Sequence, residues 1–239
     1  MRLPKDQGWN IPFDSPFYPP LPAHYRQAQF QYLFFRANPQ GVSRLLPEPL
    51  QAAPDGLCVA IGIHVPFCTS YGSFSEAVVA EQCLFQGQLG WYTSHVWHTG
   101  PSGIAAGREI YGTPKIFAAV EVRLVDRTMT TRAAMGGLPV ITLSSTLEQP
   151  VAASTMPALI PAWRLKIVPR ADGPGPALKQ LIDCTSATQD FQAHVCLQGR
   201  GVVQFQPSPL CNVTCLEPQA YLDAFLATQR LMPALPTTT

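Results

Sequence analysis

The chain has 239 residues, of which 46% are hydrophobic and 13% are charged, and its formal net charge is +1. This composition is typical of a folded protein with a substantial core and unlike that of a disordered chain. The near-neutral charge and the lack of a basic run give no support to nucleic acid or an anionic membrane as a partner.

The first 22 residues are rich in proline, and we expect an extended arm over residues 1–22. The start of the chain, "MRLPKDQGWNIPF", lacks the apolar core of a signal peptide, and no apolar run approaches the ~20 residues that cross a bilayer. We therefore expect a cytoplasmic protein. Its seven cysteines include no Cys-x-x-Cys pair and are expected to be reduced core residues.

The first half of the chain after the arm reads mainly as strands. A short helix is expected within residues 38–50, where Pro47 and Pro49 close it. Gln86-Gly87 separates two apolar runs and predicts a hairpin. The expected strands are residues 30–36, 57–65, 76–85 and 88–97.

The second half continues this pattern. A short helix is expected at residues 102–112, with Ser102 as its N-cap and Gly112 as its stop. Glu217 and the apolar face formed by Tyr221, Phe225 and Leu226 predict a long helix at residues 217–231. The remaining expectations are strands at 115–125, 129–137, 162–168 and within 188–206, a hairpin at Asp126-Arg127, and a frayed tail at 233–239.

Many short strands at close spacing and few helices predict a mainly β (α+β) fold. We expect one domain over residues 1–239, with an antiparallel β cone or barrel that encloses a cavity and a few peripheral helices, including the 217–231 helix, outside it.

Several familiar sites are missing from the sequence. It contains no G-x-S-x-G elbow, no phosphate-binding loop and no dinucleotide fingerprint. His95 and His98 have metal-ligand spacing, but they fall in an expected strand, where side chains three apart point to opposite faces. We therefore expect no metal and no other cofactor.

Lys115 stands between Pro114 and the apolar run that begins at Ile116. In a strand, Lys115, Phe117 and Ala119 share one face, while Ile116 belongs to the core face. A solvated lysine is one interpretation. The other is that Lys115 and Phe117 line a cavity, where burial or a neighbouring cation disfavours the ammonium and prepares the amine to attack a ketone.

The stretch "GREIYGTPK" (107–115) resembles the G-R-E-x-x-x-x-P-K signature of the acetoacetate decarboxylase family. The segments "YLFFRANPQGVSRLLPEPL" (32–50), "SYGSFSEAVV" (70–79) and "WRLKIVP" (163–169) are similar to further parts of that family. The resemblance implies that Lys115 is a Schiff-base lysine, for which this family is a standard example of an activated amine. It also implies a homo-oligomer.

The resemblance suggests roles for other residues. Glu76 is expected to be a cavity acid or base, and Arg108 and Glu109 belong to the signature, where an ion pair that holds the lysine loop is an equally good interpretation. Arg26 is the nearest candidate for the family's carboxylate-binding arginine, about two residues out of register. Substrate contacts are also considered for Tyr92, His95 and Phe117.

Ile116 stands where decarboxylases of the family carry a second lysine. Three functions stay open. The first is a lyase or decarboxylase that acts through a Schiff base on a keto acid or polyketide-like ketone, in secondary metabolism. The second is an aldol condensation, dehydration or cyclisation enzyme that uses the same lysine, and the third is a barrel that binds an apolar ligand without catalysis.

Overall fold

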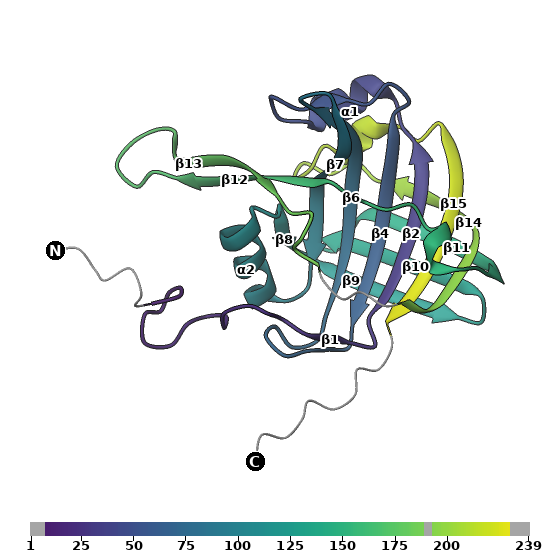
Figure 1. The fold of residues 1–239 in the computed structure, drawn as a ribbon, viewed down its shortest axis with the longest axis horizontal. Coiled ribbons are helices and arrows are strands. Elements are labelled where there is room, and N and C mark those ends of the chain that lie inside the picture. Colours follow the sequence, from purple (N-terminus) through teal and green to yellow (C-terminus); the bar gives the residue numbers. More distant parts are fainter. Residues whose placement is uncertain (1–7, 189–192, 230–239) are drawn as a thin grey trace, which may run out of the picture.

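The structure is a computed structural model that describes residues 8–188 and 193–229. Most of it is one curved sheet (Figure 1). Its main strands are β2 (Gln29–Arg36), β4 (Leu57–Val65), β6 (Phe74–Phe85), β7 (Gln88–His98), β9 (Ala119–Val125), β10 (Thr128–Met135), β11 (Leu138–Pro150), β12 (Ala162–Pro169), β13 (Pro176–Asp183), β14 (Ala193–Phe205) and β15 (Ala220–Gln229). The smaller elements are β1 (Tyr25–Arg26), β3 (Gln51–Ala52), β5 (Phe67–Cys68), β8 (Lys115–Phe117), α1 (Pro39–Leu45), α2 (Pro101–Tyr111), η1 (Ala153–Thr155) and η2 (Val213–Leu216).

The sheet runs in the order β13-β12-β7-β6-β4-β2-β15-β14-β11-β10-β9, and its pairs are antiparallel except β7 with β12 and β7 with β8. β8 pairs with β7 and continues through Ala118 into β9, the strand at the far end of the order. The backbone N–H of Ala118 donates to the carbonyl of His98 at 3.1 Å. This short segment therefore links β7, the third strand of the order, to β9 at its far end, and the expected mainly β, cone-like fold is confirmed.

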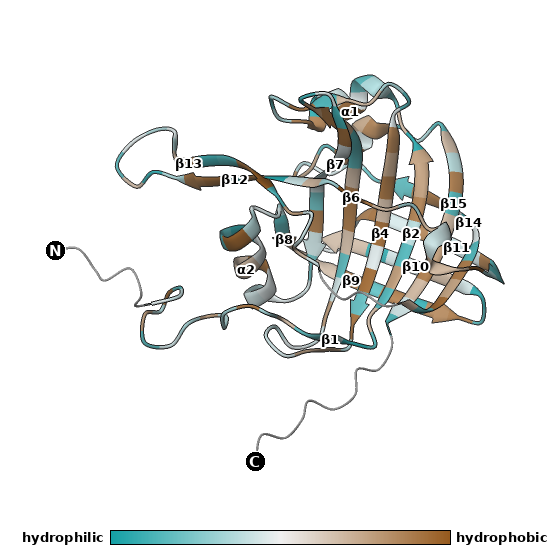
Figure 2. Cartoon of the chain, viewed as in Figure 1, coloured by the Kyte–Doolittle hydropathy of each residue, from teal (hydrophilic) through white to brown (hydrophobic). Residues whose placement is uncertain are grey.

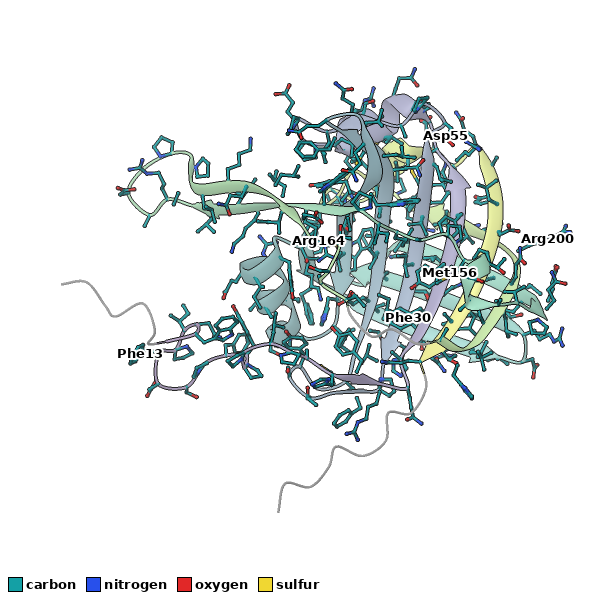
Figure 3. All side chains as sticks on the ribbon, in the orientation of Figure 1. Phe13, Phe30, Asp55, Met156, Arg164 and Arg200 are labelled. Carbon is teal, nitrogen blue, oxygen red and sulfur yellow. The ribbon has the colours of Figure 1, made fainter. Side chains whose placement is uncertain are left out.

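The central strands are rich in hydrophobic residues (Figure 2), and apolar clusters lie on both of their faces. One cluster fills the inside of the cone and includes Leu33, Phe35 and Trp97. A second lies on the outer face of β2, β4, β6 and β7, where Val151, Met156 and Leu159 of the β11–β12 connection pack over it (Figures 1 and 3). Because both faces of these strands are covered, a carboxylate or an amine on them has little access to water. It must find its partners among other side chains.

Two extensions leave the body of the sheet in Figure 1: the hairpin of β12 and β13, and the chain before β1. Residues 8–22 contain no helix or strand, and the side chain of Phe13 is exposed there (Figure 3). Residues 1–7 of the expected arm and the whole expected tail at 233–239 lie outside the described residues.

The two expected short helices are present. α1 begins with Asn38, whose side chain accepts a hydrogen bond from the N–H of Gln40. α2 begins one residue earlier than expected, with Gly100 rather than Ser102 at the N-cap position, and it ends at Gly112 in the left-handed conformation at φ 67°. Neither helix is long and apolar enough to cross a membrane.

The prediction of a helix at residues 217–231 is wrong. Residues 220–229 form β15, which pairs with both β2 and β14, and residues 230 and 231 lie outside the described part of the chain. Alanine and leucine favour helices only weakly, and packing overrides such a preference. Four consecutive residues of β15 are buried, as expected for a strand covered on both faces and not for a helix with one apolar stripe: Ala224, Phe225, Leu226 and Ala227.

Replacement of a side chain from the middle of β15 tests this arrangement. Phe225 is buried and lies edge-on to Phe34 at 6.1 Å. We expect Phe225→Ala to lower the free energy of unfolding by about 3–5 kcal/mol in urea denaturation, because it leaves a cavity between packed rings. Leu222→Ala, at a residue with 38% exposure in the same strand, should cost under about 1 kcal/mol. Equal losses in the two variants would contradict the packing.

Candidate active site

The backbone around Lys115 is fixed by the end of α2. After Gly112, the N–H of Thr113 donates to the carbonyl of Gly107 at 2.9 Å, and the N–H of Lys115 donates to the carbonyl of Thr113 at 2.7 Å. Arg108 donates from Nη1 to the carbonyl of Lys115 at 3.2 Å. Arg108 thus contacts the backbone of the lysine loop, whereas the carboxylate of Glu109 accepts a hydrogen bond from Tyr18.

The side chain of Lys115 lies against α2. A Cβ atom at Gly107 would meet Cδ and Cε of Lys115 at 2.8 Å, so only a glycine leaves room for this path. The side chain is 12% exposed. Gly107 begins the signature stretch, and its small size explains how the helix can cover the methylene groups of Lys115 and exclude water from them.

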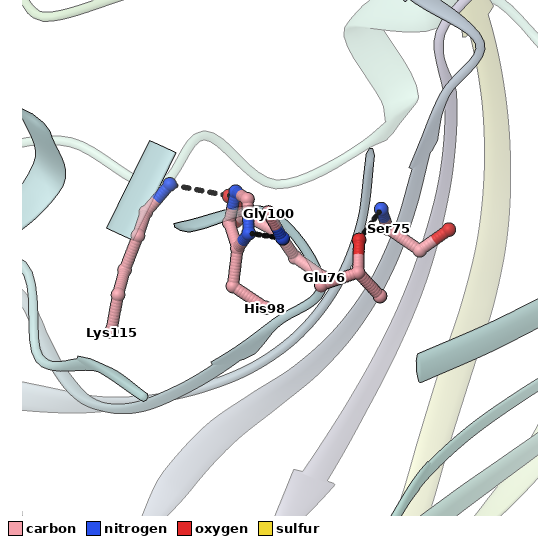
Figure 4. A network of polar contacts seen from close by, with 6 residues as sticks. Ser75, Glu76, His98, Gly100 and Lys115 are labelled. Carbon is pink, nitrogen blue, oxygen red and sulfur yellow. Dashed lines mark hydrogen bonds and ion pairs between the residues drawn. The ribbon is translucent and has the colours of Figure 1, made fainter. Parts of the chain in front are cut away.

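Glu76 faces the amine. β8 lies next to β7, with Val96 opposite Lys115, and β7 lies next to β6, with His98 opposite Glu76. Lys115 Nζ donates to Oε1 of Glu76 at 2.5 Å, and the carboxylate side chain is 9% exposed (Figure 4). The structure thus brings together the two residues that sequence analysis placed at the centre of the site.

His98 is a third member of the site, and sequence analysis considered it only as a possible metal ligand. The backbone N–H of Gly100 donates to Nδ1 of His98 at 2.7 Å, and Nε2 lies 3.2 Å from Oε1 of Glu76 (Figure 4). Its ring stacks on Phe74 at 4.7 Å. As predicted, the alternation of the strand sends His95 to the other face of β7.

The charge of Glu76 follows from these neighbours. Burial alone raises the pKa of the carboxyl, but the positive charge of Lys115 and the contacts with Lys115 and His98 outweigh it. Together they lower the pKa of Glu76 from 4.5 to about 2. The carboxylate is therefore ionised at neutral pH.

Tyr25, rather than Arg26, turns toward the site. The ring of Tyr25 meets Phe74 edge-on at 5.5 Å, and burial, followed by the charge of Glu76, raises the pKa of its phenol. Successive residues of a strand point to opposite sides, and the guanidinium of Arg26 lies 4.9 Å from the centre of the exposed Phe67 ring. The carboxylate-binding role considered for Arg26 does not fit this orientation. Sequence analysis did not consider Tyr25.

The other expected contacts lie elsewhere. Phe117 is 68% exposed because the strand predicted at 115–125 breaks at the buried Ala118. Glu109 accepts a hydrogen bond from the hydroxyl of Tyr18 at 2.5 Å and lines an open pocket of about 630 Å³ between the chain before β1, α2 and β12. Neither Lys115 nor Glu76 lines that pocket.

Tyr92 and His95 project from the face of β6 and β7 opposite Glu76, as their register partners Glu81 and Val79 do. There Ser94 donates to Oε1 of Glu81 at 2.5 Å and lies 2.8 Å from Nδ1 of His95. Burial raises the pKa of Glu81 to about 8 and lowers the pKa of His95 to about 4. Both groups are therefore neutral at pH 7, and neither contacts Lys115.

The described residues include no group of three or more His, Cys, Asp or Glu side chains suited to hold a metal ion. All seven cysteines are free thiols, and five of them are buried. The groups gathered at this site are the amine of Lys115, the carboxylate of Glu76, the imidazole of His98 and the phenol of Tyr25.

The protein belongs to a class with two features. It has a cone-like, mainly antiparallel sheet, and a nearly buried lysine–glutamate pair lies beneath a short helix. The model of the acetoacetate decarboxylase (ADC) family matches residues 10–238, and the chain belongs to this family.

The chain is also similar to individual proteins, in sequence or in fold. The chain is 26% identical over 225 residues to an acetoacetate decarboxylase of Chromobacterium violaceum, a match that covers 92% of this chain and 89% of the relative. A solved structure described as acetoacetate decarboxylase has a TM-score of 0.84 at 21% identity and covers 95% of this chain and 93% of its own. The enduracididine biosynthesis enzyme MppR, solved with the condensation product of pyruvate and imidazole 4-carboxaldehyde, has a TM-score of 0.77 at 18% identity and covers 92% of each chain.

The raised pKa of Glu81 predicts how the free energy of unfolding changes with pH. Its folded pKa of about 8 lies above the ordinary value of 4.5, so between these pH values the unfolded chain loses a proton that the folded protein keeps. The free energy of unfolding must fall as the pH rises through this window. We expect Glu81→Gln, which preserves the acceptor for Ser94, to be more stable than wild type by a few kcal/mol at pH 8, on the order given by the shift.

The same comparison should give nearly equal stabilities at pH 4.5, because the folded carboxyl is then protonated and the unfolded one is only half ionised. Urea denaturation at the two pH values measures the difference. The lowered pKa of His95 also affects stability on the acid side, but it does so in both proteins and largely cancels. A difference that does not change with pH would show that Glu81 is ionised in the folded protein.

Proposed function

We propose that this protein is a Schiff-base enzyme that acts on a keto acid or ketone and makes or breaks a carbon–carbon bond. The observation that carries the proposal is the 2.5 Å contact between Nζ of Lys115 and Oε1 of Glu76 in a nearly buried site. Membership of the ADC family supports it. A solvated surface lysine would not be held against a helix and beside a buried carboxylate.

The two residues can perform the first steps. An amine attacks a carbonyl carbon only when neutral, and Glu76 Oε1 is in contact to accept the proton that Lys115 Nζ must lose. Attack forms a C–N bond and a carbinolamine. The proton returns from Glu76 to the carbinolamine hydroxyl, which leaves as water, while the nitrogen lone pair forms the C=N bond of the iminium. The cationic nitrogen then draws in the electron pair of the carbon–carbon bond that breaks, or of the C–H bond that is deprotonated.

The surroundings of the site suit this chemistry. Phe74 lies under the amine, with Nζ 5.8 Å from the ring centre, and the apolar outer face of β4 and β6 continues from it. Apolar walls and a covered backbone keep bulk water from an iminium, which water would otherwise hydrolyse. An enzyme that uses its own lysine as the electron sink needs no other group to hold electrons.

A second candidate is an aldol condensation or dehydration through the same iminium. It is favoured by Tyr25, whose uncharged phenol turns toward Glu76 where a carboxylate-binding arginine was expected. The structural likeness to MppR, solved with a condensation product, points the same way. Decarboxylation stays the first candidate because the family model and the relatives carry that name. A homo-oligomer and a role in secondary metabolism remain part of the proposal.

Lys115→Ala tests the iminium. With borohydride and a panel of keto acids and ketones, the wild-type protein should gain the mass of a reduced adduct, located at Lys115 by peptide mapping. Lys115→Ala should lose both the adduct and turnover, whereas Lys179→Ala, at an exposed lysine, and Lys166→Ala should keep them. A folded Lys115→Ala protein with the wild-type rate would sink the mechanism. Apolar ligand binding without adducts in the wild type would favour the non-catalytic alternative.

Tyr25 and Arg26 separate the two candidate reactions. If a phenol binds a neutral oxygen of the substrate, Tyr25→Phe should lower kcat/KM by about tenfold, the value of one good hydrogen bond, and Arg26→Ala by under about twofold. If Arg26 binds a carboxylate, its variant should raise KM for keto acids and leave neutral ketones unaffected. Steady-state kinetics on matched acids and ketones distinguishes these outcomes.

A further inference from the structure

We propose that His98 is a positioning residue for Glu76: its neutral imidazole presents an N–H to the carboxylate and keeps it in place and ionised until it accepts the proton that Lys115 must lose. The role of His98 in the reaction rests on the proposed function. The contact between His98 and Glu76 does not depend on that function. His98 is fully buried, and its Nε2 lies 3.2 Å from Oε1 of Glu76.

The hydrogen bonds assign the protonation of the ring. The backbone N–H of Gly100 can donate to Nδ1 only if this nitrogen carries a lone pair, and it does so at 2.7 Å. A neutral imidazole then has its proton on Nε2, which faces Oε1 of Glu76 at 3.2 Å. The contact is bent away from the ideal hydrogen-bond direction, and no other acceptor among the described residues reaches Nε2. The turn after β7 therefore fixes the tautomer.

Packing fixes the orientation of the ring. His98 has 0% exposure, and its ring is stacked on Phe74 with an angle of 18° between the planes. On the other side, a Cβ atom at Gly103 would lie 2.7 Å from Nε2. The backbone of α2 thus lies against the edge of the imidazole. Gly103 and Gly107, one helical turn apart, cover His98 and Lys115 in the same way.

The reaction gives this contact a purpose. Glu76 must be ionised and held against Nζ of Lys115 before it can accept the proton of the amine, and a nearly buried carboxylate is costly without donors. The titratable groups that face Glu76 are Lys115 from β8, His98 from β7 and the phenol of Tyr25 from β1. Of these, His98 is the group whose tautomer is set by a separate contact, the hydrogen bond from Gly100 to its other nitrogen.

Two amide substitutions separate the two ring nitrogens. In His98→Asn the amide oxygen can replace Nδ1 as acceptor for Gly100, but no donor reaches Glu76. In His98→Gln the longer side chain places its amide nitrogen near the position of Nε2 and restores a donor. Circular dichroism and thermal unfolding check that each variant folds. The two readouts are the carboxyl ¹³C titration of Glu76 and the pH-dependent rate of borohydride trapping with acetone or pyruvate as the probe.

We expect the Glu76 carboxyl of His98→Asn to titrate at least about one unit higher than in wild type, with a maximal trapping rate about tenfold lower and a similar half-saturating probe concentration. His98→Gln should return both values toward wild type. A purely structural role would lower the stability of both variants without a shift in the titration. A folded His98→Asn protein with the wild-type titration and rate, or equal losses in both variants, would overturn the proposal.

Gly103→Ala provides an independent variant if the amide substitutions do not fold. Alanine favours the helix by about 1 kcal/mol over glycine, while its methyl group must displace the imidazole from Glu76. We expect the same upward shift in the titration of Glu76, and an unshifted titration would refute the role of His98. The ¹³C readout needs no substrate, so a wild type that forms no adduct would count against the proposed function alone.

Discussion

The structure around the site depends on one electrostatic constraint: an amine and a carboxylate must be held in contact where water is nearly absent. Such a pair is stable only with accurate geometry and further donors. β6 and β7 supply Glu76 and His98 as register neighbours, and β8 supplies Lys115 from the loop that follows α2. Helix α2 can lie against His98 and Lys115 because the residues that face them, Gly103 and Gly107, have no side chain. The parallel pairing of β7 with β8 therefore has a direct chemical consequence, since it brings the amine across to the carboxylate.

The sequence predicts part of this arrangement and omits one residue for an identifiable reason. The Gln86-Gly87 hairpin is correct, and Phe85 pairs with Gln88. Counting back along both strands from that pair places Trp97 opposite Glu76. The structure instead places His98 there, because the register shifts by one at a bulge between residues 93 and 95 of β7. The bulge has no glycine or other sequence signal, so His98 could not be assigned to Glu76 from the hairpin alone.

Other differences arise from tertiary context. The residues of β15 favour a helix by propensity, but their place between β2 and β14 decides their structure. Tyr25 and Arg26 are adjacent, and only the pairing of β1 with β5 determines which one turns inward. Glycine and proline predicted the ends of elements better, because the left-handed Gly112 ends α2 at the predicted residue. Local backbone signals thus located Lys115, whereas the partners of its amine depended on pairings distant in sequence.

The two buried glutamates of β6 show why burial alone does not make a site. Glu76 and Glu81 lie on opposite faces of one strand, and desolvation raises the pKa of both. On the outer face a lysine charge and an imidazole lower the pKa of Glu76 to about 2, whereas on the inner face a single serine leaves that of Glu81 at about 8. A protonated Glu81 has no negative charge to stabilise an ammonium or an iminium. The carboxylate that can take part in proton transfer is therefore selected by its donors, and the loop after α2 delivers the amine to that face alone.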